Sequence, residues 1–159
     1  MKIFYHCFGG THSSVTAAAI HLGLLPRDRL PTAEEIIAVP FFDRRDTRQQ
    51  GCPNLMGKDE RGDEIYVLGW PGRPQVIEAI FAGLAGVFSL PENSYKLVDV
   101  RSGVNLMMRM GGFLSRRLGL VALGRPLVAR GTRRAYRTIL ELVLTVKDEL
   151  KNTDSRPGQ

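Results

Sequence analysis

Short apolar stretches alternate along this chain with longer stretches of helical periodicity. The short ones are rich in β-branched and aromatic residues, which is typical of strands. They are KIFYHC at 2–7, IIAVPFF at 36–42, EIYVLG at 64–69, YKLVDV at 95–100 and RPLVARG at 125–131. The longer ones space their apolar residues three or four apart and predict helices. These run over 15–25, 75–90, 102–118 and 133–150.

Strands that alternate with helices predict an α/β domain with a mainly parallel sheet. Residues 55–68 add a β-hairpin, because the DERGD turn separates two strand-like stretches. Thr32 followed by Glu34 and Glu35 favours a short helical turn. The pattern as a whole predicts one three-layer domain over residues 1–150, P-loop-like or Rossmann-like, with residues 151–159 as a disordered tail.

The arginines gather in one part of this basic chain. The 159 residues carry a formal net charge of +6. Nine arginines lie between residues 101 and 137, a segment with no Asp, Glu or Lys. Guanidinium groups bind phosphates and carboxylates bidentately, so the segment favours a partner that bears such groups. The alternative is a solvated face whose arginine stems cover apolar surface.

Membrane and secreted classes fit the sequence poorly. No apolar stretch approaches the ~20 residues of a membrane helix. His6, Cys7 and two glycines interrupt the apolar N-terminus, so no signal peptide is expected. Cys7 and Cys52 are too few for a disulfide framework, which favours a cytoplasmic protein with free thiols.

A metal site is not expected either. His12 and His21 fall on opposite faces of a helix, at about 100° per residue. His6 and Cys7 point to opposite sides of a strand, and Cys52 has no neighbouring cysteine. His21 is therefore expected to be a core or helix-face residue, and no cofactor is specified.

Reactive side chains gather in HCFGGTHSS, residues 6–14, where the first predicted strand meets the first predicted helix. Ligands of open α/β sheets bind beyond the carboxyl ends of strands. The glycines let the backbone curl toward a ligand, and the helix start offers N–H groups to an anion. We therefore predict an anion-binding loop. Its residues are Gly9, Gly10, Thr11, His12, Ser13 and Ser14.

The Walker A loop, G-x-x-x-x-G-K-[ST], resembles this segment in part. His12 and Ser13 stand where the Lys and Ser of that pattern would be, and its first Gly is absent at the required spacing. A protonated histidine is a weaker cationic donor than lysine. Nucleotide binding is thus predicted without the usual hydrolytic lysine.

The segment also resembles the cysteine phosphatase loop, H-C-x-x-G-x-x-R-[ST]. His6, Cys7, Gly10 and Ser14 match that pattern, whereas Ser13 replaces its arginine. The resemblance implies that loop amides hold a phosphate while the cysteine thiolate attacks it. The missing arginine would have to come from another part of the chain. Arg116 and Arg125 are the candidates.

Cys7 allows two interpretations. A helix N-terminus favours a thiolate, which would make Cys7 a nucleophile whose reactivity His6 or His12 adjusts. Cysteine is also among the most buried residue types, so a buried thiol at the end of a strand is the alternative.

Two aspartates follow predicted strands. Asp43 ends IIAVPFF and Asp99 lies in LVDVRSG, so each is a candidate base or magnesium ligand. Turn or capping roles are the alternative for both. Arg101 follows Asp99 closely and is predicted to contact the same ligand.

The segment MGGFLSRR at 110–117 places two glycines in a helical context, at a cost of about 1 kcal/mol each relative to alanine. A close approach to a ligand, a close approach to another helix, or a plain helix break would explain them. GRPLVARGT at 124–132 resembles the wall of the nucleotide site in P-loop kinases.

Four segments together resemble an uncharacterised family of small proteins from spore-forming Gram-positive bacteria. They are YHCFGGTHSSVTAAAIHLGLLP, DERGDEIYVLG, GGFLSR and GRPLVARGT. The resemblance spans nearly the whole chain. It implies a cytoplasmic bacterial protein and brings no activity with it.

Three functions are consistent with these observations. The first is a phosphate- or nucleotide-binding protein, in which Arg101, Arg116 and Arg125 close over the loop. The second is a thiol enzyme, a phosphatase or transferase, with catalytic Cys7, His12 and Asp99. The third is a basic, non-enzymatic binding protein, for which nucleic acid is a less favoured partner because few aromatics accompany the arginines. No membrane partner is expected, and the sequence leaves the oligomeric state open.

Overall fold

A computed structural model describes residues 1–44, 50–103 and 105–154, which contain one open sheet of four strands. The strands are β1 (Lys2–Cys7), β2 (Asn54–Lys58), β3 (Glu64–Gly69) and β4 (Tyr95–Asp99). They lie in the order β2-β3-β1-β4. β1 is parallel to β3 and β4, and β2 is antiparallel to β3. The α/β class and the hairpin are therefore confirmed.

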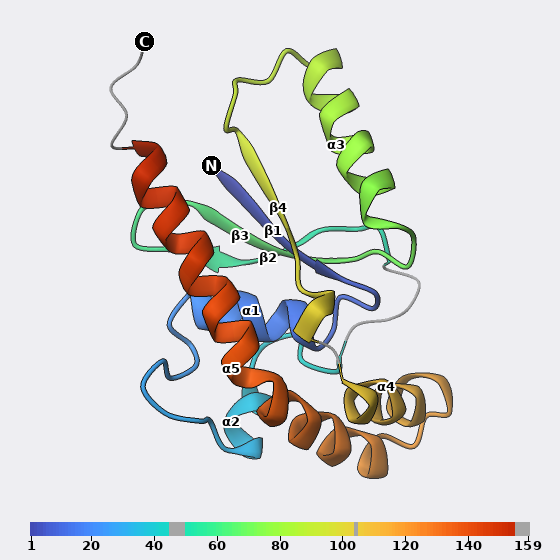
Figure 1. Cartoon of the computed structure of the whole chain (residues 1–159). Coiled ribbons are helices and arrows are strands. Elements are labelled where there is room, and N and C mark those ends of the chain that lie inside the picture. Colours follow the sequence, from blue (N-terminus) through green and yellow to red (C-terminus); the bar gives the residue numbers. More distant parts are fainter. Residues whose placement is uncertain (45–49, 104, 155–159) are drawn as a thin grey trace.

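Five α-helices lie in the described part of the chain. They are α1 (Ser13–His21), α2 (Ala33–Ala38), α3 (Pro74–Val87), α4 (Leu106–Gly112) and α5 (Val121–Asp154). A 3₁₀ turn, η2 (Arg101–Gly103), precedes α4, and a π-helical stretch, η3 (Phe113–Arg117), follows it. None of the described helices combines the length and the apolar character needed to cross a bilayer. Figure 1 shows the strands between α3 and α5.

The alternation of side chains along β1 assigns the helices to the two faces of the sheet. Tyr5 points to α1, where its hydroxyl oxygen lies 2.7 Å from His21 Nδ1. Phe4 points to the opposite face, where its ring meets Phe81 of α3 edge-on, with the ring centroids 5.0 Å apart. α5 packs against α1. Helices therefore lie on both sides of the sheet.

The predicted strand at 36–42 is wrong, because helix α2 occupies its first residues. The Thr32 hydroxyl accepts the Glu35 N–H, and the Glu35 carboxylate accepts the Thr32 N–H, which forms a capping box. The short helical turn predicted there is confirmed. Phe41 and Asp43 then have φ angles of 66° and 51°, so the chain turns instead of extending. Asp43 thus follows a turn and not a strand.

The predicted strand at 125–131 is also wrong, because these residues belong to α5. Gly124 and Gly131 do not end an element. A Cβ on Gly124 would lie 2.6 Å from the carbonyl oxygen of Gly111, and one on Gly131 would lie 2.8 Å from the Met108 side chain. These glycines let α4 approach α5 closely. The likeness to a wall of a nucleotide site is therefore not supported at this segment.

Two boundaries also differ from the prediction. α5 extends through Asp154, so residues 151–154 are helical, while residues 155–159 lie outside the described part. The helix predicted over 102–118 is divided into η2, α4 and η3. Asn105 starts α4 by accepting the Met108 N–H on its side chain.

Candidate anion-binding site at the end of the first strand

The loop from β1 to α1 lies at the carboxyl end of a central strand and is held against the end of β3. The Trp70 N–H donates to the Cys7 carbonyl oxygen at 2.8 Å. A Cβ on Gly69 would lie 2.8 Å from the Gly9 carbonyl oxygen, so only glycine fits at the end of β3. The loop conformation is thus fixed by the neighbouring strand as well as by its own residues.

The Cys7 sulfur lies inside the curve of this loop. It is buried and accepts the Gly10 N–H at 3.2 Å, and the Ser14 hydroxyl oxygen lies 3.3 Å from it. Gly10 has a φ of 65°, which favours glycine. The structure thus brings together Cys7, Gly10 and Ser14, three of the residues that match the cysteine phosphatase pattern.

Helix α1 begins at Ser13 without a side-chain cap. A helix start leaves its first N–H groups without intrahelical acceptors and carries positive dipole charge. The Ser13 hydroxyl is also unusual: it is 1% exposed and has no hydrogen-bond partner among the described residues. A buried polar group without a partner costs about 1–3 kcal/mol. The first N–H groups of α1 and the Ser13 hydroxyl are therefore hydrogen-bond donors for a bound anion.

Asp43 provides the centre of a buried polar cluster next to the loop. His12 Nε2 donates to Asp43 Oδ1 at 3.1 Å, and the Ser115 hydroxyl and Arg125 Nε donate to Oδ2 at 2.5 and 3.3 Å. The Asp43 N–H donates to the Thr11 carbonyl oxygen at 3.1 Å. Burial raises the pKa of the Asp43 carboxyl, but the hydrogen bonds from His12 and Ser115 outweigh it and hold that pKa below its usual value.

The His12 ring is oriented by packing as well as by Asp43. A Cβ on Gly112 would lie 3.0 Å from His12 Cε1. The Phe42 ring meets the imidazole edge-on, with the ring centroids 5.5 Å apart. The Thr11 hydroxyl oxygen lies 3.4 Å from His12 Nδ1. Because Nε2 carries the hydrogen that is donated to Asp43, Nδ1 of the neutral ring accepts a hydrogen bond from the Thr11 hydroxyl. The absence of a side chain at Gly112 thus leaves space for the His12 imidazole.

Asp99 and Arg101 lie apart from Cys7 and His12. Asp99 pairs in register with His6, whose side chain points to the α3 face, whereas the next residue, Cys7, points to the α1 face. Arg101 Nε and Nη2 donate to the two Asp99 oxygens at 3.0 Å each, and Nη1 donates to the Gly72 carbonyl oxygen. The predicted catalytic set of Cys7, His12 and Asp99 is therefore divided between two faces.

The arginines predicted to reach the loop differ in what the structure shows of them. Arg125 Nη2 also donates to the Asp43 carbonyl oxygen, so this guanidinium comes from α5 to the edge of the loop. Arg101 is paired with Asp99. The Arg116 side chain lies outside the described side chains. Among the described side chains of these three arginines, Arg125 is thus the one that reaches the site.

Two features of this region did not follow from the sequence. His6 is buried, and neither ring nitrogen has a hydrogen-bond partner among the described residues. Burial lowers the pKa of His6, although the nearby Asp99 carboxylate opposes that shift. His21 is buried as expected, but its Nε2 also lies 3.0 Å from Asp59 Oδ2, which ties α1 to the β2–β3 turn. These contacts depend on strand register, which the sequence alone does not fix.

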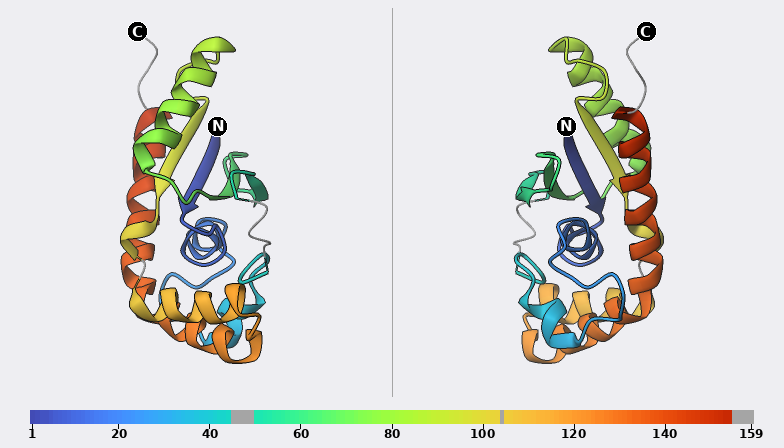
Figure 2. Two further views of the ribbon diagram at one scale, coloured as in Figure 1. Left: turned by 90° about the vertical axis from the view of Figure 1, so that its right-hand side faces the viewer. Right: turned by 90° about the vertical axis from the view of Figure 1, so that its left-hand side faces the viewer.

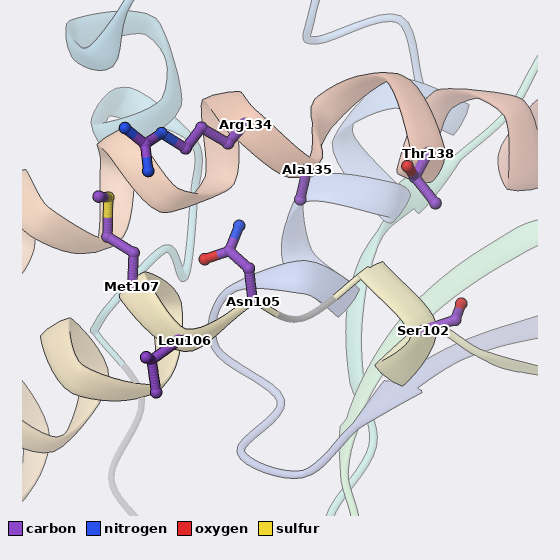
Figure 3. Close-up of a pocket in the computed structure, with 7 residues that line it drawn as sticks. All are labelled: Ser102, Asn105, Leu106, Met107, Arg134, Ala135 and Thr138. Atoms are coloured by element: carbon purple, nitrogen blue, oxygen red, sulfur yellow. The ribbon is translucent and has the colours of Figure 1, made fainter.

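A surface depression of about 400 Å³ lies elsewhere, between η2, the start of α4, and α5 (Figure 3). Arg134 is the one cationic side chain among its lining residues, and Asn105 lies on the opposite wall. None of the loop residues lines it. Among the described residues no three His, Cys, Asp or Glu side chains gather as a metal site would require.

The model of one protein family matches residues 2–148, and its description is "Protein of unknown function (DUF3189)". The chain belongs to this DUF3189 family. No curated protein and no solved structure matches it. The DUF3189 match includes the β1–α1 loop, Asp43 and Arg125, so all parts of the candidate site lie in the family domain.

Proposed function

We propose that this chain binds phosphate, or a small molecule that bears phosphate, on the P-loop-like segment from Gly9 to Ser14. One observation carries the proposal. α1 begins without a side-chain cap, and the Ser13 hydroxyl beside its first N–H groups is 1% exposed with no partner among the described residues. An anion at this helix start would accept from those donors.

Asp43 explains how hydrogen-bond donors reach the loop without the Walker lysine or the phosphatase arginine. Its carboxylate holds His12 and Arg125 beside the loop as an internal anion. A phosphate that reaches Ser13 competes with Asp43 for these two donors. Arg125 then supplies the charge-assisted hydrogen bonds that arginine forms with phosphate.

A second function is favoured by the contacts of Cys7. The Gly10 N–H and the Ser14 hydroxyl lie within hydrogen-bond distance of its sulfur, and such donors stabilise a thiolate. In this hypothesis the thiolate attacks the phosphorus of a phosphate monoester, the ester P–O bond breaks, and the leaving alkoxide takes a proton from water. Water then attacks the phosphocysteine, which releases inorganic phosphate and restores the thiolate.

The exposed arginines of α4 and α5 keep the third hypothesis, nonspecific binding to nucleic acid, as a weaker alternative. The exposed ones are Arg109, Arg130, Arg134 and Arg137.

A cytoplasmic location in a spore-forming bacterium also remains a prediction from the sequence resemblance.

Thermal unfolding with and without inorganic phosphate tests the proposed function. Millimolar phosphate is expected to raise the melting temperature of the wild type, because a ligand that binds only the folded state stabilises it. Ser13→Ala should reduce this increase. Ser94→Ala is the matched control, since Ser94 also has a buried hydroxyl without a partner among the described residues but precedes β4.

Asp43→Asn separates the roles of the cluster. The variant should unfold at a lower temperature because it loses the buried carboxylate that accepts hydrogen bonds from His12, Ser115 and Arg125. Phosphate should nevertheless raise its melting temperature more than that of the wild type. If phosphate and sulfate stabilise neither protein, the proposal fails.

If Cys7→Ser abolishes hydrolysis of a phosphate monoester while phosphate still binds, the second function is added to the first.

A further inference from the structure

We propose that the outer face of α3 is an interface with a second copy of this chain. The helix is apolar on nearly all sides, with Glu78 as the one charged residue between Pro74 and Val87. Such helices are normally buried. Only Ile77 of α3 is buried, and Phe81 is half-buried against the sheet. Figure 1 shows the other helices away from its outer side.

The exposed large side chains form one stripe. Val76, Ile80, Leu84 and Val87 are spaced by four, four and three residues, so they share a helix face, and they are between 42% and 78% exposed. Phe88 and Leu90, just beyond the helix end, are also exposed, with Phe88 68% exposed. This is the pattern of a helix that packs against another element.

The neighbouring stripe of α3 consists of small residues: Ala79, Gly83 and Gly86, all exposed. A Cβ on Gly83 or Gly86 would meet nothing within 4 Å, in contrast to the tightly packed glycines of α4 and α5. Glycine inside a helix costs about 1 kcal/mol relative to alanine, and contacts among the described residues give no reason for it here. A close approach by a second helix supplies that reason.

The two stripes make the face complementary to itself. In a twofold arrangement the same patch meets its copy, so the large stripe of one helix lies on the small stripe of the other. A depression of about 570 Å³, lined by Ala82, Gly86, Leu90 and Tyr95 among others, adjoins the small stripe and can receive large side chains. Figure 2 shows α3 at an end of the molecule, where a second copy has access.

The area of the face also fits a dimer. A large apolar side chain presents roughly 150–200 Å² when fully exposed. Six such side chains at about half exposure offer on the order of 500–600 Å², and the small stripe and the depression bring this toward the ~800 Å² that each partner contributes to a stable interface. The absence of Lys and Arg from the helix opposes a membrane surface as the occupant, because interfacial helices are rich in both.

Analytical ultracentrifugation of the full chain from low to high micromolar concentration tests the proposal. The wild type is expected to be a dimer, and Leu84→Glu is expected to be a monomer with an unchanged circular dichroism spectrum. The matched control is Leu144→Glu, on an exposed position of α5, which should remain a dimer. A monomeric wild type, or a Leu84→Glu variant that still dimerises, would overturn the proposal.

Gly83→Leu provides a second test that does not depend on a buried charge. The substitution adds apolar area and improves helix propensity, and its Cβ meets nothing in the monomer. The substitution should nevertheless raise the dissociation constant of the dimer at least tenfold, because the added side chain fills the small stripe. If Gly83→Leu strengthens association, the contact is nonspecific and the proposal is wrong.

Discussion

Asp43 accepts hydrogen bonds from side chains that are 31, 72 and 82 positions away in the sequence. Those side chains belong to His12, Ser115 and Arg125. The sequence indicates Asp43, His12 and Arg125 as separate candidates, whereas the part played by Ser115 is seen only in the structure. Their meeting depends on how α4 and α5 cross beneath the loop, which local periodicity does not reveal.

His6 gives the first prediction at this scale. Burial lowers its pKa from 6.5, so the unfolded chain binds the proton more readily than the folded one. The stability that neutral His6 contributes is therefore present above pH 6.5 and is lost as the pH falls toward its folded pKa. Urea unfolding between about pH 7.5 and pH 5 should show a falling free energy of unfolding.

His6→Gln removes this titration and should flatten the dependence on pH. A remaining slope is expected from His21, whose pKa burial also lowers. If the wild type and His6→Gln show the same slope, His6 does not titrate in this range and its assigned environment is wrong.

At the scale of elements, the strands of the sheet and most of the helical segments could be predicted, but the segments 36–42 and 125–131 could not. β1, β3, β4 and α3 carry clear periodic patterns bounded by turn residues. The stretch at 125–131 misleads because Gly124 and Gly131 look like strand boundaries. In the structure they are contact points between α4 and α5, and a single sequence does not distinguish a glycine that ends an element from one that admits a neighbouring helix.

Gly124→Ala tests this explanation. Its Cβ would lie 2.5 Å from the Ser115 backbone nitrogen, so overpacking should lower the free energy of unfolding by about 1–3 kcal/mol. Gly83→Ala, measured at low concentration, is the control in an open helical position and should raise that free energy by up to about 1 kcal/mol. Equal effects of the two substitutions in denaturant unfolding would show that α4 does not approach α5 as closely as described.

At the scale of the whole molecule, the carboxyl ends of β3, β1 and β4 divide their polar residues between two faces. The α1 face holds Cys7, with Ser13, Asp43 and Arg125 near the start of α1, while the α3 face holds His6, Asp99 and Arg101. The sequence predicted that polar residues would gather at these strand ends, because parallel strands end at a common edge. It did not predict their separation, because a face is assigned only once the register is known.

The most direct test of the anion site is a titration of the ¹⁵N-labelled chain with inorganic phosphate, followed in ¹H–¹⁵N correlation spectra. Binding at the start of α1 predicts the largest and saturable shifts at the amides of Gly10, Thr11, Ser13 and Ser14 and at Arg125 Nε. Shifts confined to Arg134 and its neighbours on α5, or no saturable shift in the loop, would contradict the account.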